Sequence, residues 1–269
     1  MKLTMLYSTL EDGLTSLIEN LPSPNKLVNI IIIHQMNENK NYDDKIKILL
    51  NSRSDIQYYK SYTRGVAISR NIAINKSNNS DIILFCDDDV IYTNKFQEEI
   101  LKQYEKNPTA GFITFSYSNN LDMKDLAPKF STLGFVHTLR SILRVGTIEV
   151  TARRNMIIEN KIKFPEDMGA GAKYFLCDEP VFLSQFLKKN IRGIYCPFII
   201  GYHPAVSSGQ KFNRIEAFAS RYLCFTRIFG SFLGLGLYYL YLAKNFNKFK
   251  TLSDVNNALF IMFKMKHDK

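Results

Sequence analysis

GVAISRNIAI (residues 65–74) and DIILFCDDDV (residues 81–90) are the two most informative segments of this chain of 269 residues. The first has the apolar spacing of a helix entered through Gly65, which we expect over 66–76. The second begins with an apolar run, 81–86, that is typical of a strand buried on both faces of a sheet, and three aspartates follow it directly. A helix that leads into a buried strand is part of a βαβ unit, so the two segments together predict a parallel sheet.

The same alternation of strands and helices extends outward in both directions. Further strands are expected at 3–9, 28–34, 56–60, 110–117, 147–152 and within 191–203. Further helices are expected at 12–21, 43–50, 94–106 with Asn94 as N-cap, and from about 179 to 189. The sequence therefore predicts an α/β fold in which helices flank a mixed, mostly parallel sheet.

Composition and cysteine usage narrow the class of protein. With 46% apolar and 22% charged residues, the chain can bury a large core, which excludes intrinsic disorder. Cys86, Cys177, Cys196 and Cys224 form no CxxC pair, so the pattern indicates neither a zinc site nor a redox pair, and we expect buried, reduced thiols. Residues 1–10 lack the features of a secretion signal, so we expect a cytoplasmic protein.

Asp87, Asp88 and Asp89 follow the strand at 81–86 without a break. Ligands bind outside the carboxyl ends of parallel strands, and in extended backbone Asp87 and Asp89 project to the same side. Adjacent carboxylates repel one another unless a cation neutralises them, and oxygen ligands suit Mg²⁺ or Mn²⁺. The triplet thus predicts a site for a cation and a diphosphate. Two alternatives are a solvated acidic turn and a phosphatase of the haloacid dehalogenase type, although that class has Thr or Val where Ile91 stands.

Four motifs resemble those of family 2 glycosyltransferases with the GT-A fold, of the type that builds bacterial surface polysaccharides. Two are SRN at 69–71 and the aspartate triplet that ends its metal-binding strand. FPEDMGAGA at 164–172, together with CDE at 177–179, is similar to the acceptor loop and acidic pair of the family. YHP at 202–204 is similar to the histidine–proline pair after its last core strand. From this resemblance we expect a catalytic domain over 1–210 and a separate segment over 211–269.

The resemblance implies transfer of a sugar from a nucleotide-diphosphate sugar, expected to be a UDP-sugar, to a hydroxyl group of a glycan or lipid-linked acceptor, with inversion. It assigns Mg²⁺ or Mn²⁺ to Asp87 and Asp89. His203, in the histidine–proline turn, is expected as a further metal ligand, with a diphosphate ligand or a structural histidine as alternatives. Such a transfer also needs a base for the attacking hydroxyl. The family has Glu followed by Asp, with the second acid as base, whereas this chain has Asp178 followed by Glu179. Either acid therefore remains a candidate, and an N-cap Asp with a first-turn Glu is the structural alternative.

The remaining site residues also come from the resemblance. Ser8, Thr9 and Gln35 end the first two expected strands, at the edge where the family binds the nucleotide. Arg70 and Asp88 are expected beside them as donor-binding residues, and a structural ion pair of Arg70 with the aspartates is the alternative. The resemblance places the acceptor over three residues of the glycine-rich loop, Gly169, Ala170 and Gly171, and over the variable segment 119–146.

The segment from 211 onward is basic and apolar. Residues 201–269 contain ten Lys and Arg against three Asp and Glu. The difference, +7, is most of the net charge of +10 that the whole chain carries. Residues 228–243 carry no charge, but as a helix they would span about 24 Å, less than the ~30 Å core of a bilayer. We therefore expect this segment to lie on the cytoplasmic face of the cell membrane, with a single span or a buried helix as alternatives. Gly230 and Gly234 have the GxxxG spacing of some helix dimers, so a dimer stays open as well.

Two further functions stay open at this point. A nucleotidyltransferase on a related sheet would need a glycine-rich phosphate loop after the first strand, and the sequence has none there. A membrane-docked module that binds a sugar nucleotide or anionic lipid without turnover is compatible with the reversed acid pair. Nucleic-acid binding is not indicated, because the basic residues are interleaved with aliphatic residues at helical spacing.

Overall fold

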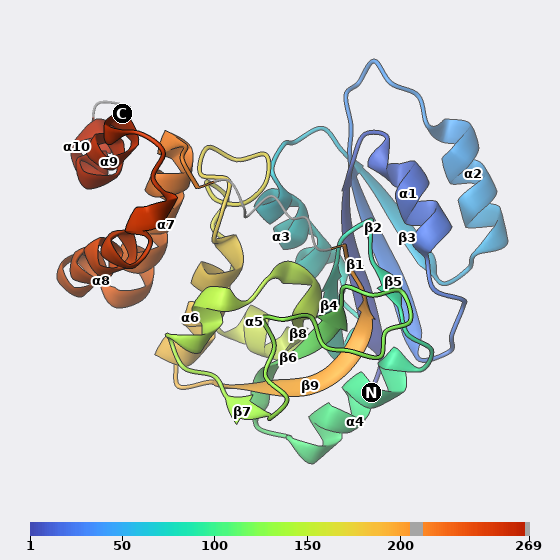
Figure 1. Ribbon diagram of the computed structural model, residues 1–269. Coiled ribbons are helices and arrows are strands. Elements are labelled where there is room, and N and C mark those ends of the chain that lie inside the picture. Colours follow the sequence, from blue (N-terminus) through green and yellow to red (C-terminus); the bar gives the residue numbers. More distant parts are fainter. Residues whose placement is uncertain (205–211, 267–269) are drawn as a thin grey trace.

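The structure, a computed structural model, describes residues 1–204 and 212–266. Within these residues a nine-stranded sheet runs through the centre of the molecule in the order β3-β2-β1-β4-β8-β6-β9-β5, with β7 paired to β9 (Figure 1). The strands are β1 (Leu3–Leu10), β2 (Val28–Gln35), β3 (Ile56–Ser61), β4 (Ile82–Cys86), β5 (Ile91–Tyr92), β6 (Ala110–Ser118), β7 (Phe135–Val136), β8 (Val150–Arg153) and β9 (Arg192–Tyr202).

The sheet is mixed, as the sequence predicts. Strands β3, β2, β1 and β4 are parallel, β8 runs antiparallel to β4 and β6, and β6 and β9 are again parallel. Tyr7 on β1 pairs with Cys86 on β4, and Leu10 pairs with Gln35 on β2. The residues that follow these strands are therefore delivered to one edge of the sheet, which is where an open parallel sheet binds ligands.

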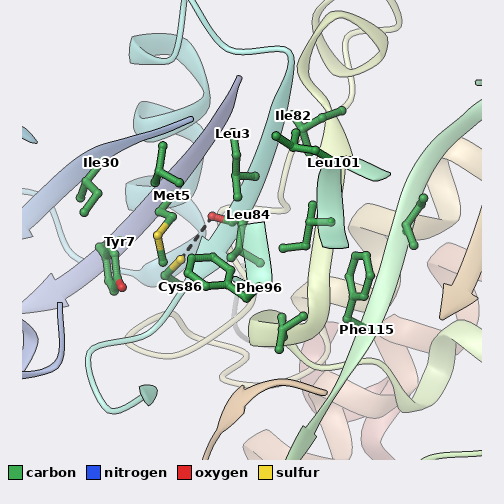
Figure 2. Close-up of a cluster of buried hydrophobic side chains, with 14 of the residues drawn as sticks. Leu3, Met5, Tyr7, Ile30, Ile82, Leu84, Cys86, Phe96, Leu101 and Phe115 are labelled. Atoms are coloured by element: carbon green, nitrogen blue, oxygen red, sulfur yellow. Dashed lines mark hydrogen bonds between the residues drawn. The ribbon is translucent and has the colours of Figure 1, made fainter. Parts of the chain in front are cut away.

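Both faces of the sheet are buried, and this explains the uninterrupted apolar runs. On β4, Ile82, Leu84 and Cys86 face one hydrophobic cluster, whereas Ile83 and Phe85 face another on the opposite side. Figure 2 shows the first cluster, in which side chains from β1, β4 and α4 (Phe96–Lys106) interlock. Since successive strand residues alternate between faces, a strand covered on both sides must be apolar throughout.

Helices cover each face. On one side lie α1 (Gly13–Asn20), α2 (Asp43–Ser52) and α4, and on the other lie α3 (Val66–Lys76), α5 (Arg154–Glu159) and α6 (Asp178–Lys188). Short 3₁₀ turns, η1 (Ser141–Arg144) and η2 (Thr147–Glu149), precede β8. The α/β architecture with a mostly parallel sheet flanked by helices is confirmed.

The structure corrects the sequence-based expectations at several helix and strand starts. Asn94 is not an N-cap, because α4 begins at Phe96 after Lys95, which adopts a left-handed conformation with φ of 64°. Asp178 is not an N-cap either, since α6 begins at Asp178 after Cys177, whose φ is 70°. The strand expected from residue 147 begins only at Val150, after η2. The short elements β5, β7 and α5 are additions to the expected set.

The C-terminal segment folds into four helices within the described residues. These are α7 (Ile215–Phe229), α8 (Ser231–Lys244), α9 (Leu252–Leu259) and α10 (Ile261–Lys266), with a short turn, η4 (Phe246–Lys248), before α9. The uncharged stretch 228–243 is therefore not one helix, because Gly230, at φ of 84°, separates α7 from α8. The expected boundary at 210 lies outside the described residues.

Contacts within the chain account for Gly234 and for the placement of α7. A Cβ atom on Gly234 would lie 2.5 Å from the carbonyl oxygen of Phe225, so this glycine allows α8 to pack closely on α7. Cys224 and Ile228 of α7 pack against Met168, which precedes α6, and against Val181 of α6. Gly234 thus serves packing between two helices of the same chain, whereas Gly230 has no atom of the described residues near its Cβ position and lies at the break between them. None of the helices in the described residues combines the length and hydropathy needed to cross a bilayer, so the expected alternative of a single span finds no candidate there.

Candidate active site

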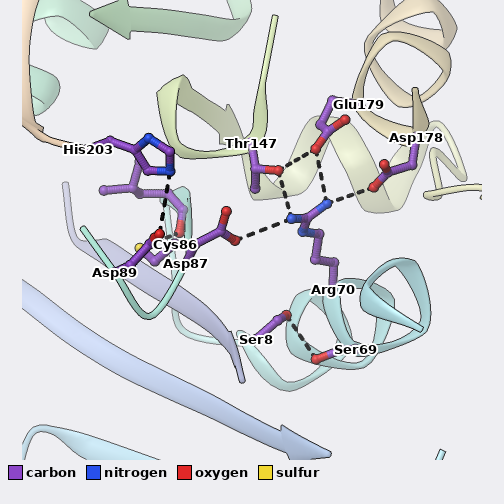
Figure 3. Close-up of polar contacts among 11 residues, drawn as sticks. Ser8, Ser69, Arg70, Cys86, Asp87, Asp89, Thr147, Asp178, Glu179 and His203 are labelled. Atoms are coloured by element: carbon purple, nitrogen blue, oxygen red, sulfur yellow. Dashed lines mark hydrogen bonds and ion pairs between the residues drawn. The ribbon is translucent and has the colours of Figure 1, made fainter. Parts of the chain in front are cut away.

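Arg70 on α3 is the buried centre of a polar cluster at the carboxyl-end edge of the sheet (Figure 3). Its side chain is 4% exposed. Nη1 donates to Oδ2 of Asp178 at 2.7 Å, and Nη2 donates to Oγ1 of Thr147 at 2.7 Å. Oε1 of Glu179 and Oδ1 of Asp87 each lie 3.4 Å from the guanidinium nitrogens. One permanently charged side chain therefore holds three carboxylates and a hydroxyl from three parts of the chain.

The SRN sequence supplies three consecutive side chains that contact three different elements. Oγ of Ser69 donates to Oγ of Ser8, at the end of β1, at 2.8 Å. Asn71 holds the start of the glycine-rich loop, because its Oδ1 accepts from the Phe164 N–H at 2.9 Å and its Nδ2 donates to the Phe164 carbonyl at 3.0 Å. Successive helix residues project about 100° apart. Ser69 therefore reaches β1, Arg70 reaches the polar cluster, and Asn71 reaches the loop.

The glycine-rich loop seats the start of α6 against α3. The Val66 N–H donates to the Ala170 carbonyl at 2.9 Å. Gly169 has φ of +92°, and a Cβ atom there would lie 2.7 Å from Cγ of Asp178. A Cβ atom on Gly171, which has φ of +79°, would lie 3.3 Å from the backbone of Gly65. The loop therefore needs glycine both for its backbone conformation and for its close approach to the acidic pair.

The three aspartates after β4 point to three different partners. Asp87 faces Arg70, and Asp89 faces His203, whose Nε2 lies 3.7 Å from Oδ2 of Asp89 (Figure 3). Asp88 turns away from the cluster, where its Oδ2 accepts from Oγ1 of Thr9 at 2.8 Å. Burial raises the pKa of Asp87 and Asp88, an effect that Arg70 opposes at the first and the Thr9 hydroxyl at the second. Asp87 and Asp89 remain available to a common ligand, whereas the Asp88 carboxylate is held inside the protein by its hydrogen bond from Thr9.

Asp178 and Glu179 differ in exposure. The Asp178 side chain is 4% exposed, and its burial, together with the neighbouring Glu179, raises the pKa of Asp178 to about 8. The Glu179 side chain is 16% exposed, and its Oε1 accepts from the hydroxyl of Thr147. Of the two acids, only Glu179 therefore combines a fixed carboxylate with access to an incoming hydroxyl group.

The residues at Asp89 fit a divalent cation that arrives with a diphosphate. The Asp89 side chain is 50% exposed, and the imidazole of His203 faces it. Nδ1 of His203 is buried and has no hydrogen-bond partner in the described structure. In the described ranges, no group of three or more His, Cys, Asp or Glu side chains is arranged to hold a metal ion. Mg²⁺ commonly uses one or two carboxylates and takes its other ligands from substrate phosphates and water, so this sparse set suits a substrate-borne ion.

The three residues expected at the nucleotide edge lie there, and each of them is hydrogen-bonded within the protein, Ser8 through Ser69. Thr9 is 3% exposed and bonded to Asp88, and Gln35 is 5% exposed and donates through Nε2 to the carbonyl oxygens of Thr63 and Gly65 at 3.1 and 3.2 Å. Ser8 is only partly buried. Direct contact of these residues with a donor stays a prediction, and the hydrogen bonds show that Gln35 supports the turn before α3.

Thr147 is the cluster residue that the sequence does not single out. It bonds both Arg70 and Glu179, yet it lies in a 3₁₀ turn where a strand is expected. A lone threonine in an irregular segment carries no signal of its own, so this contact emerges only from the fold.

Comparisons with known proteins identify the family and the fold. The sequence model described as glycosyl transferase family 2 matches residues 7–161, which is more than half of the chain. A comparison with curated protein sequences found no match. Among solved structures, S. aureus TarS 1–349 is similar with a TM-score of 0.67 and 14% identity over 97% of this chain and 80% of that one.

Two further similar structures were solved with ligands. TarS 1–349 in complex with UDP-GlcNAc is similar with a TM-score of 0.65 and 14% identity over 97% of this chain and 79% of that one. The mannosyltransferase PcManGT from Pyrobaculum calidifontis, in complex with GDP-Man and Mn²⁺, is similar with a TM-score of 0.58 and 15% identity over 95% of this chain and 77% of that one. The chain spans 44% of the longer TarS structure. At these identities the likeness shows the fold.

Replacing Arg70 with Gln should lower the free energy of unfolding by about 3–5 kcal/mol, because it leaves buried carboxylates without their cation. Loss of the cation also raises the pKa of Asp178 further above its wild-type value of about 8, so the folded variant keeps this proton to higher pH and its deficit should grow as pH rises from about 7 to 9. Urea titrations across this pH range measure both effects.

The matched control is Arg227→Gln, which removes an arginine whose pair with Asp167 is one-third exposed. Its expected cost is at most about 1 kcal/mol, with little dependence on pH. Equal losses for the two variants would show that Arg70 is not the cation on which the cluster depends.

Proposed function

Because the chain belongs to glycosyl transferase family 2, we propose that it is an inverting glycosyltransferase that moves a sugar from a UDP-sugar to a hydroxyl group of a glycan or lipid-linked acceptor in polysaccharide synthesis. One observation carries the proposal. Arg70 separates the solvent-facing pair Asp87 and Asp89 on one side from Glu179 on the other (Figure 3). A site for the donor diphosphate and a base for the acceptor thus stand on either side of one fixed cation.

The donor side is proposed to form around Asp87, Asp89 and His203. When bound there, Mg²⁺ or Mn²⁺ would offset the negative charge that develops on the departing diphosphate. Asp89 and His203 would hold the ion, and Asp87, held by Arg70, would orient it. The complex of PcManGT with GDP-Man and Mn²⁺ supports this arrangement. The complex of TarS with UDP-GlcNAc supports a UDP-sugar.

Glu179 is proposed as the base. Its carboxylate is partly exposed, and its position is fixed by Thr147 and Arg70. In the transfer, the acceptor oxygen forms a bond to the anomeric carbon from the face opposite the leaving group. The hydroxyl proton passes to the Glu179 carboxylate, and the bond between the anomeric carbon and the diphosphate oxygen breaks, with its electrons leaving on the nucleoside diphosphate. Asp178, buried against Gly169 and bonded to Arg70, would position the base.

Replacing Glu179 with Gln should lower kcat by a factor of about 10²–10⁴, because the amide cannot accept the proton. Gln retains an oxygen for the Thr147 hydroxyl, so binding of UDP should remain within about twofold of wild type, as calorimetry would measure. The rate of sugar transfer is followed with the donor and acceptor that support wild-type turnover.

Asp178→Asn serves as the matched variant, because its amide oxygen can still accept from Arg70. We expect this variant to retain transfer to within about tenfold, since a positioning residue loses less than a base. The opposite ranking, with the Asp178 variant inactive and the Glu179 variant active, would move the base to Asp178. Full activity in both variants would show that neither Asp178 nor Glu179 is the base.

The C-terminal helices are proposed to dock on the cytoplasmic face of a membrane rich in anionic lipid. One face of α8 packs on α7 through Gly234, Tyr238 and Leu242. The other face leaves large apolar side chains in solvent, including Phe232 at 95% and Leu240 at 67% exposure. Exposed lysines follow on the same helix and in the turn after it, Lys244, Lys248 and Lys250. Apolar side chains next to cations are what an interfacial segment requires.

Replacing Phe232 and Leu240 together with Ser should reduce binding to vesicles of phosphatidylglycerol and phosphatidylcholine by about 100-fold or more, since each side chain contributes about 1.5–3 kcal/mol when fully buried. Co-sedimentation measures the bound fraction. The control removes two apolar side chains of similar exposure elsewhere, Ile48 at 70% and Leu121 at 67%. Vesicle binding that is absent in wild type, or equal in both variants, would contradict membrane docking by α8.

A further inference from the structure

A cleft of about 990 Å³ lies between the sheet and the C-terminal helices. Residues from β6, β7 and β9 and from the η1 turn form one wall, and residues from α7 and α8 form the other. The C-terminal segment, which we expect from its sequence to lie on a membrane, therefore completes a cavity together with the sheet. Asp87, Asp88 and Asp89 do not line this cleft, so it is distinct from the proposed donor side.

The cleft is strongly basic. Five cations line it, Lys129, Arg140, Arg144, Arg221 and Lys244, against the single carboxylate of Glu149. Lys129 forms an ion pair with Glu149 and so neutralises it. No ion pair is found for the other four cations in residues 1–204 and 212–266. They come from two parts of the chain, η1 and its preceding residue on one wall and the C-terminal helices on the other. The fold thus gathers uncompensated positive charge at this one place.

Aromatic rings stand beside these cations. Phe130 and Tyr195 are parallel, with an interplanar angle of 2° and ring centroids 6.2 Å apart, and Phe135 packs on Tyr195 at 4.8 Å. Across the cleft, the guanidinium of Arg221 lies 5.9 Å from the ring of Tyr241. Flat apolar surfaces next to cations suit a ligand that alternates apolar or sugar-ring surface with negative charge.

The cleft adjoins the proposed base. Cys177, which lines it, is the residue directly before Asp178 and Glu179. Glu149, which also lines it, ends the η2 turn whose first residue, Thr147, donates to Glu179. Glu179 itself does not line the cleft, so the connection runs through these neighbouring residues, and a hydroxyl group of a bound ligand would have to extend past them to reach the base.

From these observations, and resting on the proposed transferase function, we propose that the cleft binds an acceptor that carries phosphate. Guanidinium groups bind phosphate through paired hydrogen bonds, and four unpaired cations would repel one another without an anionic ligand. The phosphate can belong to a phosphorylated glycan or to a lipid-phosphate-linked sugar, which present the same chemistry to Arg140, Arg144 and Lys244.

The test measures binding of two matched pairs of probes by calorimetry with the full chain. Phosphorylated mannopentaose and plain mannopentaose represent the glycan source, whereas decyl phosphate and decyl maltoside, below their micellar concentrations, represent the lipid source. The phosphorylated member of at least one pair should bind at least about tenfold more tightly than its neutral partner. High salt should weaken the binding of this phosphorylated probe. The pair with the larger preference identifies the source of the phosphate.

Arg140→Gln/Arg144→Gln should weaken the preferred probe by about tenfold, since each partly exposed charge contributes up to about 1 kcal/mol. The control, Lys47→Gln/Lys106→Gln, removes two exposed cations that do not line the cleft and should leave probe binding unchanged. Equal affinity for charged and neutral probes, no binding of either phosphate, or equal effects of the two double variants would overturn the proposal. UDP binding by the wild type is measured in parallel. Binding of UDP without binding of either phosphate would overturn the acceptor cleft alone, whereas absence of UDP binding would count against the transferase function.

Discussion

The ion cluster around Arg70 is the interaction on which the arrangement of the site depends. Its guanidinium joins α3 to Asp178 and Glu179, which lie 108 and 109 residues away in the sequence, and to Asp87 after β4. A buried arginine without carboxylates would be costly, and so would buried carboxylates without the arginine. The helix, the strand end and the start of α6 must therefore come together at once. The position of the proposed base is a consequence of this mutual requirement.

The rest of the molecule can be understood as support for that cluster. The two-sided core fixes β1 and β4 in register, so that Ser8 and Asp87 reach the same edge of the sheet. Gly169 and Gly171 let the loop before α6 approach α3 closely enough to seat Asp178. The C-terminal helices then pack on α6 and close the basic cleft, which is lined by Cys177, two residues before Glu179. In this account one segment would serve both membrane docking and acceptor recognition, which suits an enzyme whose acceptor is made or held at a membrane.

Much of the fold could be predicted from the sequence because its strongest signals are local. Continuous apolar runs such as 28–34 and 81–86 occur where a strand is covered on both faces, and α3 begins and ends where its spacing indicates. The predictions failed where tertiary contacts override local preference. Lys95 and Cys177 adopt left-handed conformations before their helices, and Gly230 divides an apolar stretch that reads as one helix. Thr147 and the basic cleft could not be predicted, because they depend on residues far apart in the sequence.

The most direct test of the transferase assignment is release of nucleoside diphosphate by the purified full chain across a panel of UDP-, GDP- and dTDP-sugars. Each donor is incubated with Mn²⁺, with Mg²⁺ and with EDTA, and wild type is compared with Asp89→Asn. We predict slow hydrolysis of one donor, a UDP-sugar, with water in place of the acceptor, which requires the metal and is lost in the variant. Release that is insensitive to EDTA and unchanged in the variant would contradict the account. So would the absence of both release and binding for every donor in the panel.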